Sequence, residues 1–163
     1  MKVHFIDTSV LAVVLDLPGF CDSSEIKKKI SEELKHIINE KNECLILPFA
    51  TIIETGNHIA HCNDGRIRRS LAEKFSEVIE KTINNEMPWQ YYGQQLTSED
   101  LHIICKDFPD KAMCGVGFGD MSIIRAYERY KDETPAVSEI RIWSLDEHFA
   151  SYHEQLKMVP RRN

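Results

Sequence analysis

The sequence contains no run of 18 or more apolar residues, and it does not begin with the basic and apolar segments of a secretory signal. We therefore expect neither a membrane span nor secretion, and we predict a cytoplasmic protein. A CxxC pair is also lacking, and the 5 cysteines are scattered and odd in number. This usage is typical of reduced, mostly packed thiols and argues against a disulfide framework.

Positive charge is scarce as well, since the formal net charge at pH 7 is -6. Phosphate contacts are supplied by Lys and Arg, so this balance argues against a protein whose whole surface grips nucleic acid. It does not exclude a local basic rim around an acidic site. The candidates for such a rim, which would contact a phosphate backbone, are Arg66, Arg68, Arg69 and Arg125.

The sequence has no phosphate-cradling motif. Three glycines occur within residues 115–119, but they lack the GxGxxG spacing, and no Lys-Ser or Lys-Thr pair follows them. We predict that residues 111–119 form a loop, in which this many glycines require unusual backbone angles or the close approach of another group.

The chain of 163 residues is 42% hydrophobic, which predicts one domain over residues 1–163 with a full core and a frayed tail at 158–163. Strands are predicted over residues 3–7, 43–48, 89–96 and 139–144. Helices are predicted over 8–17, from 22 to about 38, 50–61, 66–84, from 97 to about 108, from 120 onward, and 147–152. This alternation predicts an α/β fold, a three-layer α/β/α sandwich around a mostly parallel sheet of four to five strands.

Four carboxylates fall where strands end or helices begin. Asp7 and Asp146 each end an apolar strand, Glu54 lies one turn into the helix after the second strand, and Asp120 opens a helix. Ligands of open α/β sheets bind at the carboxyl ends of the strands, so these acids can converge there. The alternative for Asp7 is that it caps the following helix, because Asp is a favourable N-cap residue.

Convergence of carboxylates has an energetic cost that points to a bound cation. Two carboxylates about 5 Å apart repel by roughly 3 kcal/mol at an effective dielectric constant near 20. A divalent ion removes this conflict, and oxygen ligands without a matching Cys or His set favour Mg²⁺ or Mn²⁺. Such an ion binds phosphate oxygens and makes hydroxide available, which predicts metal-dependent phosphodiester hydrolysis.

Four segments in this order resemble the motifs of the PIN domain family. They are Phe5-Ile6-Asp7-Thr8-Ser9, Pro48 with Glu54 beyond it, the run from Gly119 to Ile124, and the run from Ile142 to Phe149. The resemblance implies a Mg²⁺/Mn²⁺-dependent ribonuclease in which Asp7, Glu54, Asp120 and Asp146 are the catalytic, metal-binding acids. It also implies that the hydroxyls of Ser9 and Ser144 orient Asp7.

Many small members of that family are VapC-type toxins of type II toxin–antitoxin pairs. The resemblance therefore implies an endoribonuclease that acts on RNA, forms a homodimer and is silenced by a cognate antitoxin protein. This chain departs from the usual toxin by its extra length between residues 84 and 119 and by its acidity. A PIN-like RNA-processing nuclease outside toxin–antitoxin systems is thus an alternative.

Two alternatives lie outside the nuclease class. One is a phosphatase or phosphotransferase with an aspartyl intermediate on Asp7, but such enzymes usually carry a second Asp two residues later, where this chain has Ser9. The other is a non-catalytic interaction domain that retains the fold, although it offers no physical reason for four acids at one sheet edge.

Overall fold

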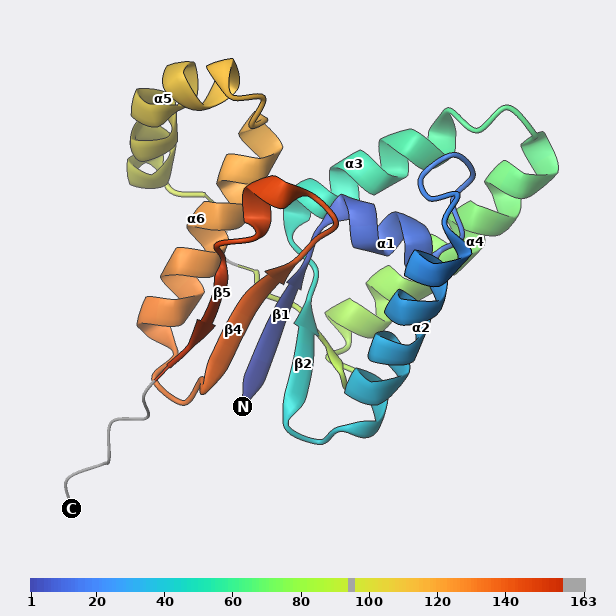
Figure 1. The fold of residues 1–163 in the computed structure, drawn as a ribbon, viewed down its shortest axis with the longest axis horizontal. Coiled ribbons are helices and arrows are strands. Elements are labelled where there is room, and N and C mark those ends of the chain that lie inside the picture. The colour runs from blue at the N-terminus through green and yellow to red at the C-terminus, as the bar shows by residue number, and fades with distance from the viewer. Residues whose placement is uncertain (94–95, 157–163) are drawn as a thin grey trace.

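The fold is α/β with one five-stranded, mostly parallel sheet (Figure 1). The computed structural model describes residues 1–93 and 96–156. The strands are β1 (Lys2–Ile6), β2 (Glu43–Ile46), β3 (Trp89–Gln90), β4 (Glu139–Trp143) and β5 (His153–Gln155). They lie in the order β3-β2-β1-β4-β5, and only β5 runs antiparallel to its neighbour. The central strand is thus β1, which leads directly into Asp7.

Helices lie on both faces of this sheet. They are α1 (Thr8–Val14), α2 (Ser24–Asn39), α3 (Phe49–Ala60), α4 (Gly65–Ile83), α5 (Ser98–Met113) and α6 (Phe118–Glu133). One core joins Ile6 and Leu45 of the sheet to α1, α2, α3 and α4, and a second joins the opposite face, including Phe5, to α6. A third, smaller cluster holds α5 against α6 through Ile104 and Met121.

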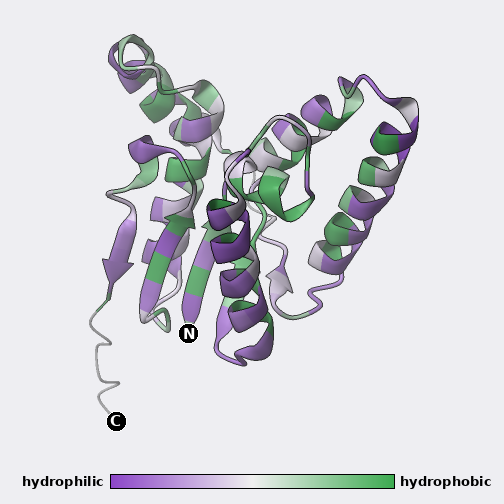
Figure 2. Cartoon of the chain, turned by 45° about the vertical axis from the view of Figure 1, so that its right-hand side comes forward, coloured by the Kyte–Doolittle hydropathy of each residue, from purple (hydrophilic) through white to green (hydrophobic). Residues whose placement is uncertain are grey.

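The polarity of each helix surface depends on how deeply the helix lies in these layers. Most residues of α1 are buried, and in Figure 2 this helix is apolar along most of its length. In contrast, α2 and α4 are polar over their outer faces, and α2 buries only Ile30 and Ile37. Among the described residues, none of the helices combines the length and apolar character that a membrane span requires.

The predicted elements are recovered in most places, with three corrections. The loop predicted over 111–119 is limited to residues 114–117, because α5 extends through Pro109 to Met113 and α6 already begins at Phe118. The predicted closing helix over 147–152 is wrong, since only Glu147–Phe149 form a 3-10 turn. The chain then adds β5, which the sequence did not predict because this strand is short and largely exposed.

The strand predicted over 89–96 is far shorter than expected. It is limited to Trp89–Gln90, after which Tyr91 leaves the sheet, and residues 94–95 lie outside the described residues. The tail predicted to fray at 158–163 also lies outside them.

The inward face of α3 is partly polar. Ile53 is exposed, whereas Thr51 and Thr55 are fully buried. The hydroxyl of Thr51 donates a hydrogen bond of 2.8 Å to the backbone oxygen of Ile6. This contact brings α3 close to the end of β1. The small polar side chain of Thr51 fits this narrow space, where a large apolar side chain would not.

A buried polar network lies on the α2 side of the sheet. His4 Nε2 is 2.8 Å from Glu43 Oε2, and Arg141 Nε donates to His4 Nδ1 at 2.7 Å. The guanidinium of Arg141 also reaches Glu33 of α2 at 2.6 Å. Burial and the nearby Arg141 charge lower the pKa of His4 below its ordinary value, so the neutral ring is the form that fits this network.

The lowered pKa of His4 predicts a loss of stability in mild acid. The unfolded chain takes up a proton near pH 6.5 more readily than the folded protein, so the contribution of His4 is present above about pH 6.5 and is lost below it. Urea unfolding from about pH 7.5 to about pH 5.5 should show this decline for the natural protein, whereas His4→Gln should flatten it. His102→Gln, at an exposed position on α5, is the matched control. An equal pH slope for His4→Gln and the natural protein would contradict the prediction.

Candidate functional site

Asp7 and Asp146 lie at the carboxyl ends of adjacent parallel strands. The backbone N–H of Asp7 donates to the carbonyl oxygen of Trp143 at 3.0 Å, which extends the β1–β4 pairing to the first acid. Asp7 is only 5% exposed. Its carboxylate also accepts a hydrogen bond from the backbone N–H of Ser9, so Asp7 is the N-cap of α1 as well as the acid at the strand end.

Two serine hydroxyls bind the same oxygen of Asp7. Ser9 Oγ and Ser144 Oγ each donate to Asp7 Oδ2 at 2.7 Å. Each hydroxyl also accepts a backbone N–H from the segment after β4, Ser9 from Leu145 and Ser144 from Asp146, both at 2.9 Å. The hydroxyls predicted to support Asp7 therefore connect it to the backbone of the segment that carries Asp146.

Glu54 reaches the site from α3. Thr8 Oγ1 donates to Glu54 Oε2 at 2.8 Å, which ties this half-buried carboxylate to the residue after Asp7. The other oxygen, Oε1, lies so close to Gly119 that a Cβ at this position would collide with it. Gly119 thus allows the close approach between α3 and α6 that places Glu54 beside the start of α6.

Asp120 lies in the first turn of α6 and is not the residue that opens the helix. Its Oδ2 accepts the backbone N–H of Gly117 at 2.8 Å, and Gly117 is the N-cap of the helix. Burial raises the pKa of Asp120; the bond from Gly117 opposes this shift, and the negative charges of Asp7 and Asp146 raise the pKa further. The three acids are therefore close enough to act on one another.

Asp146 is held by the turn that follows it. Its Oδ1 accepts the backbone N–H of His148 at 2.9 Å and lies 2.9 Å from His148 Nδ1. The side chain of Asp146 is 43% exposed, so this acid forms the open side of the cluster while Asp7 forms its buried side. A pocket of about 320 Å³ is lined by Ser144 and Asp146 and by residues of β4 as far as Arg141.

The structure brings the four predicted acids to one edge of the sheet without forming a ready-made coordination group. Asp7, Asp120 and Asp146 interact electrostatically, and Glu54 adjoins them through Gly119. Within residues 1–93 and 96–156, no three side chains of His, Cys, Asp or Glu meet as a metal-binding group. The donors at this edge are carboxylate and hydroxyl oxygens, which are the ligands that Mg²⁺ and Mn²⁺ prefer.

The predicted basic rim is not beside these acids. Arg66, Arg68 and Arg69 lie in the first turns of α4, at the end of α3 that is remote from β1 in Figure 1. Arg68 donates to the Cys62 carbonyl oxygen and Arg69 pairs with Glu73.

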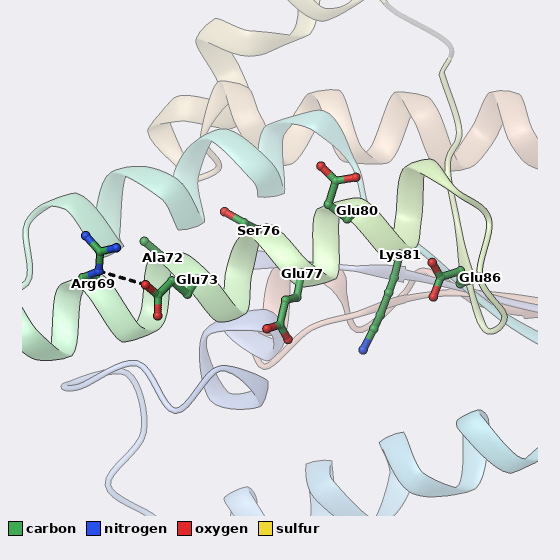
Figure 3. A pocket seen from close by; sticks show the side chains of 8 residues that line it. All are labelled: Arg69, Ala72, Glu73, Ser76, Glu77, Glu80, Lys81 and Glu86. Carbon is green, nitrogen blue, oxygen red and sulfur yellow. Dashed lines mark hydrogen bonds and ion pairs between the residues drawn. The ribbon is translucent and has the colours of Figure 1, made fainter.

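Arg69 also stands at the end of a groove of about 720 Å³ along α4 (Figure 3). The charged residues that line this groove are Arg69, Glu73, Glu77, Glu80, Lys81 and Glu86. Acids outnumber bases in this set, so the groove offers little attraction to a phosphate backbone.

The fourth predicted contact to RNA, Arg125, has a structural role. It pairs with Asp100 and with Glu128, and Asp100 is 1% exposed. Burial alone would raise the pKa of Asp100, but hydrogen bonds from Thr97, Arg125 and Arg129 outweigh it and hold the pKa far below its ordinary value. This network fastens the start of α5 to α6.

Three contacts of the site could not be predicted from the sequence. The bond from Thr8 to Glu54 and the contact of His148 with the backbone oxygen of Cys114 depend on long-range packing. The bond from the Gly117 N–H to Asp120 has the spacing of a helix-capping pair. Glycine has no capping side chain, so the sequence does not identify Gly117 as the N-cap residue. The density of glycine before Asp120 was the one usable signal, because it predicted either unusual angles, found at Gly115 with a φ of +80°, or close approach, found at Gly119.

No protein-family model, curated protein or solved structure matches this chain.

We expect Asp7→Asn to lower the pKa of Asp120. The substitution removes one of the negative charges that raise this pKa, and Asn keeps the helix cap because it is an equally good N-cap residue. Carboxyl-carbon NMR titration of Asp120 measures the shift. Asp132→Asn, at an exposed position in α6, is the control and should leave the titration unchanged. An unaltered midpoint in Asp7→Asn would mean that the two acids do not interact.

The crowding at Gly119 predicts coupling between Gly119 and Thr8. Thr8→Val removes the hydroxyl that donates to Glu54, which should cost about 1 kcal/mol in the natural protein. In the Gly119→Ala background the new Cβ displaces the Glu54 carboxylate, so the same change should cost clearly less.

Urea unfolding of the four proteins gives this double-mutant cycle. Gly56→Ala is a matched background, because a Cβ at Gly56 meets Phe75 at an ordinary 3.6 Å. The full cost of Thr8→Val should remain there. Equal costs in all three backgrounds would exclude the contact between Gly119 and Glu54.

Proposed function

We propose that this protein is a Mg²⁺- or Mn²⁺-dependent endoribonuclease with a PIN-like fold. The observation that carries the proposal is the meeting of acids at this sheet edge, where partial burial of Asp120 and then the negative charges of Asp7 and Asp146 raise its pKa. Such an arrangement is costly for the protein alone and is relieved by a divalent cation. The order of the four acids along the chain and their location at the carboxyl edge of a mostly parallel sheet support the same proposal.

The donors fit such an ion in their chemistry. Asp7, Glu54, Asp120 and Asp146 would hold it, since hard oxygen ligands suit Mg²⁺ and Mn²⁺ better than Zn²⁺. When bound, the ion would polarise the scissile phosphate and make hydroxide available near neutral pH.

The residues of the chain have distinct tasks in this proposal. Ser9 and Ser144 fix the orientation of Asp7 through its Oδ2, as a rigid support for a charged ligand requires. Asp120 is fixed by the backbone N–H of Gly117 at the start of α6, which places its carboxylate beside Asp7 and Asp146 to hold the same ion. Asp146 is exposed enough to face a substrate that arrives from solvent.

The role as a toxin of a type II toxin–antitoxin pair is the finer part of the proposal. It includes RNA as the substrate, a homodimer and a cognate antitoxin, and it is supported by the resemblance of the four motifs to the PIN domain family, many of whose small members are VapC-type toxins. The extra length between residues 84 and 119 keeps a PIN-like RNA-processing nuclease as the alternative within the same chemistry.

The proposal is tested with purified protein and a fluorescent single-stranded RNA, with Mn²⁺ or with EDTA. We expect cleavage that requires Mn²⁺ and falls by about 100-fold or more in Asp7→Asn and in Asp120→Asn, which corresponds to the loss of roughly 3 kcal/mol of transition-state stabilisation. Circular dichroism should show that both variants remain folded. Asp132→Asn is the matched control and should cleave at the natural rate.

Two results would overturn the proposal. Full cleavage by Asp7→Asn would exclude the mechanism, because the most buried of the four acids would then be dispensable. Calorimetry that detects no Mn²⁺ binding to the natural protein, together with no cleavage, would favour the non-catalytic interaction domain.

A further inference from the structure

His148 connects the acidic site to the end of α5. Its Nδ1 is 2.9 Å from Asp146 Oδ1, and its Nε2 is 3.1 Å from the backbone oxygen of Cys114, which is the C-cap residue of α5. We call these two contacts the His148 bridge. Gly115 lies directly beside the ring, since a Cβ there would be 3.9 Å from His148 Cε1. The bridge therefore spans the gap between the segment after β4 and the α5–α6 corner.

Both partners of the ring are hydrogen-bond acceptors. The ring nitrogens face the carboxylate oxygen of Asp146 on one side and the carbonyl oxygen of Cys114 on the other. The carbonyl at Cys114 also belongs to the last turn of a helix, where the backbone carries partial negative charge. The His148 bridge thus connects the Asp146 carboxylate to the carbonyl oxygen at the end of α5 through one rigid ring.

The α5–α6 corner also determines where Asp120 lies. Cys114 is followed by the turn at Gly115 and then by Gly117, whose N–H binds Asp120 Oδ2. Because α5 is held mainly to α6, through Asp100 and a small apolar cluster, the corner needs a further contact to be fixed against the sheet. His148 supplies such a contact, at the point where the chain enters α6.

We propose that His148 is a positioning residue of the acidic site, which holds Asp146 and the α5–α6 corner at the separation that lets Asp146 and Asp120 serve one cation. This inference rests on the proposed function for the identity of the ligand. The bridge itself is a property of the metal-free protein. His148 touches no substrate in this role, because it acts through the Asp146 carboxylate and through the backbone that leads to Asp120.

The test separates the two contacts by substitution. His148→Ala removes both contacts. His148→Asn can place an amide N–H near the position of Nδ1 and so keeps the contact to Asp146, whereas His148→Gln can place one near Nε2 and so keeps the contact to Cys114. The side chain is 41% exposed, so these changes remove no buried core group. His102→Ala, at an exposed histidine of α5, is the matched control.

The first measurement is amide hydrogen exchange in the metal-free protein. The N–H groups of Cys114, Gly115 and Val116 all bond to backbone oxygens of α5, so they report on the corner. We expect exchange at these amides to rise about fivefold in His148→Ala and to return toward the natural rate in His148→Gln.

The second measurement is Mn²⁺ affinity by calorimetry. We expect binding to weaken about tenfold in His148→Ala, as is usual when a residue that orients a ligand is lost, and to recover only in part in His148→Asn and in His148→Gln, because each keeps one of the two contacts. Unchanged exchange at the corner, or Mn²⁺ affinity within about twofold of the natural protein, would overturn the inference. Failure of the natural protein itself to bind Mn²⁺ would instead overturn the proposed function, while the exchange measurement still decides whether the bridge holds the corner.

Discussion

The partial burial of Asp120 beside the negative charges of Asp7 and Asp146 is the constraint that the rest of the site must satisfy. Two carboxylates about 5 Å apart repel by roughly 3 kcal/mol at an effective dielectric constant near 20, which is a large share of the stability of a small domain. Hydrogen-bond donors surround each of these three carboxylates. Ser9 and Ser144 both donate to Asp7, and each of the other two acids receives a backbone N–H from its own turn. The acids are thereby fixed in place, but their charges are not neutralised.

The sheet supplies the rigidity that this arrangement needs. Asp7 and Asp146 follow neighbouring parallel strands, so their separation is set by backbone pairing rather than by flexible side chains. Asp120 depends on a helix that packs across the opposite face, through Tyr127 and Phe5 among others. A displacement of α6 would therefore move Asp120 relative to the two strand-end acids. The buried ion pairs of Asp100 with Arg125 and Arg129 lie outside the site, but they connect α5 to this helix.

The sequence was most informative where a local pattern has one physical meaning. An apolar strand that ends in an acid, seen at Asp7 and at Asp146, placed both residues at the correct sheet edge. The predicted helix end near residue 108 was wrong, because packing of α5 on α6 lets the helix continue through Pro109 to Met113. The prediction also missed β5, whose polar residues show no alternation strong enough to predict a strand. The contact between Glu54 and Gly119 could not be predicted, since it joins residues far apart in the chain.

The way Asp7 is held distinguishes two kinds of phosphate chemistry. A carboxylate that attacks phosphorus must present a free lone pair to the substrate along the line of the breaking bond. Asp7 is 5% exposed, and its Oδ2 accepts from Ser9 Oγ, Ser144 Oγ and the Ser9 backbone. Hydrogen bonds of this kind stabilise the negative charge and reduce its tendency to form a covalent bond. The same contacts are suitable for an oxygen ligand, which must stay ionised and immobile. The contacts that fix Oδ2 therefore suit Asp7 to the part of an oxygen ligand in the proposed hydrolysis by activated water.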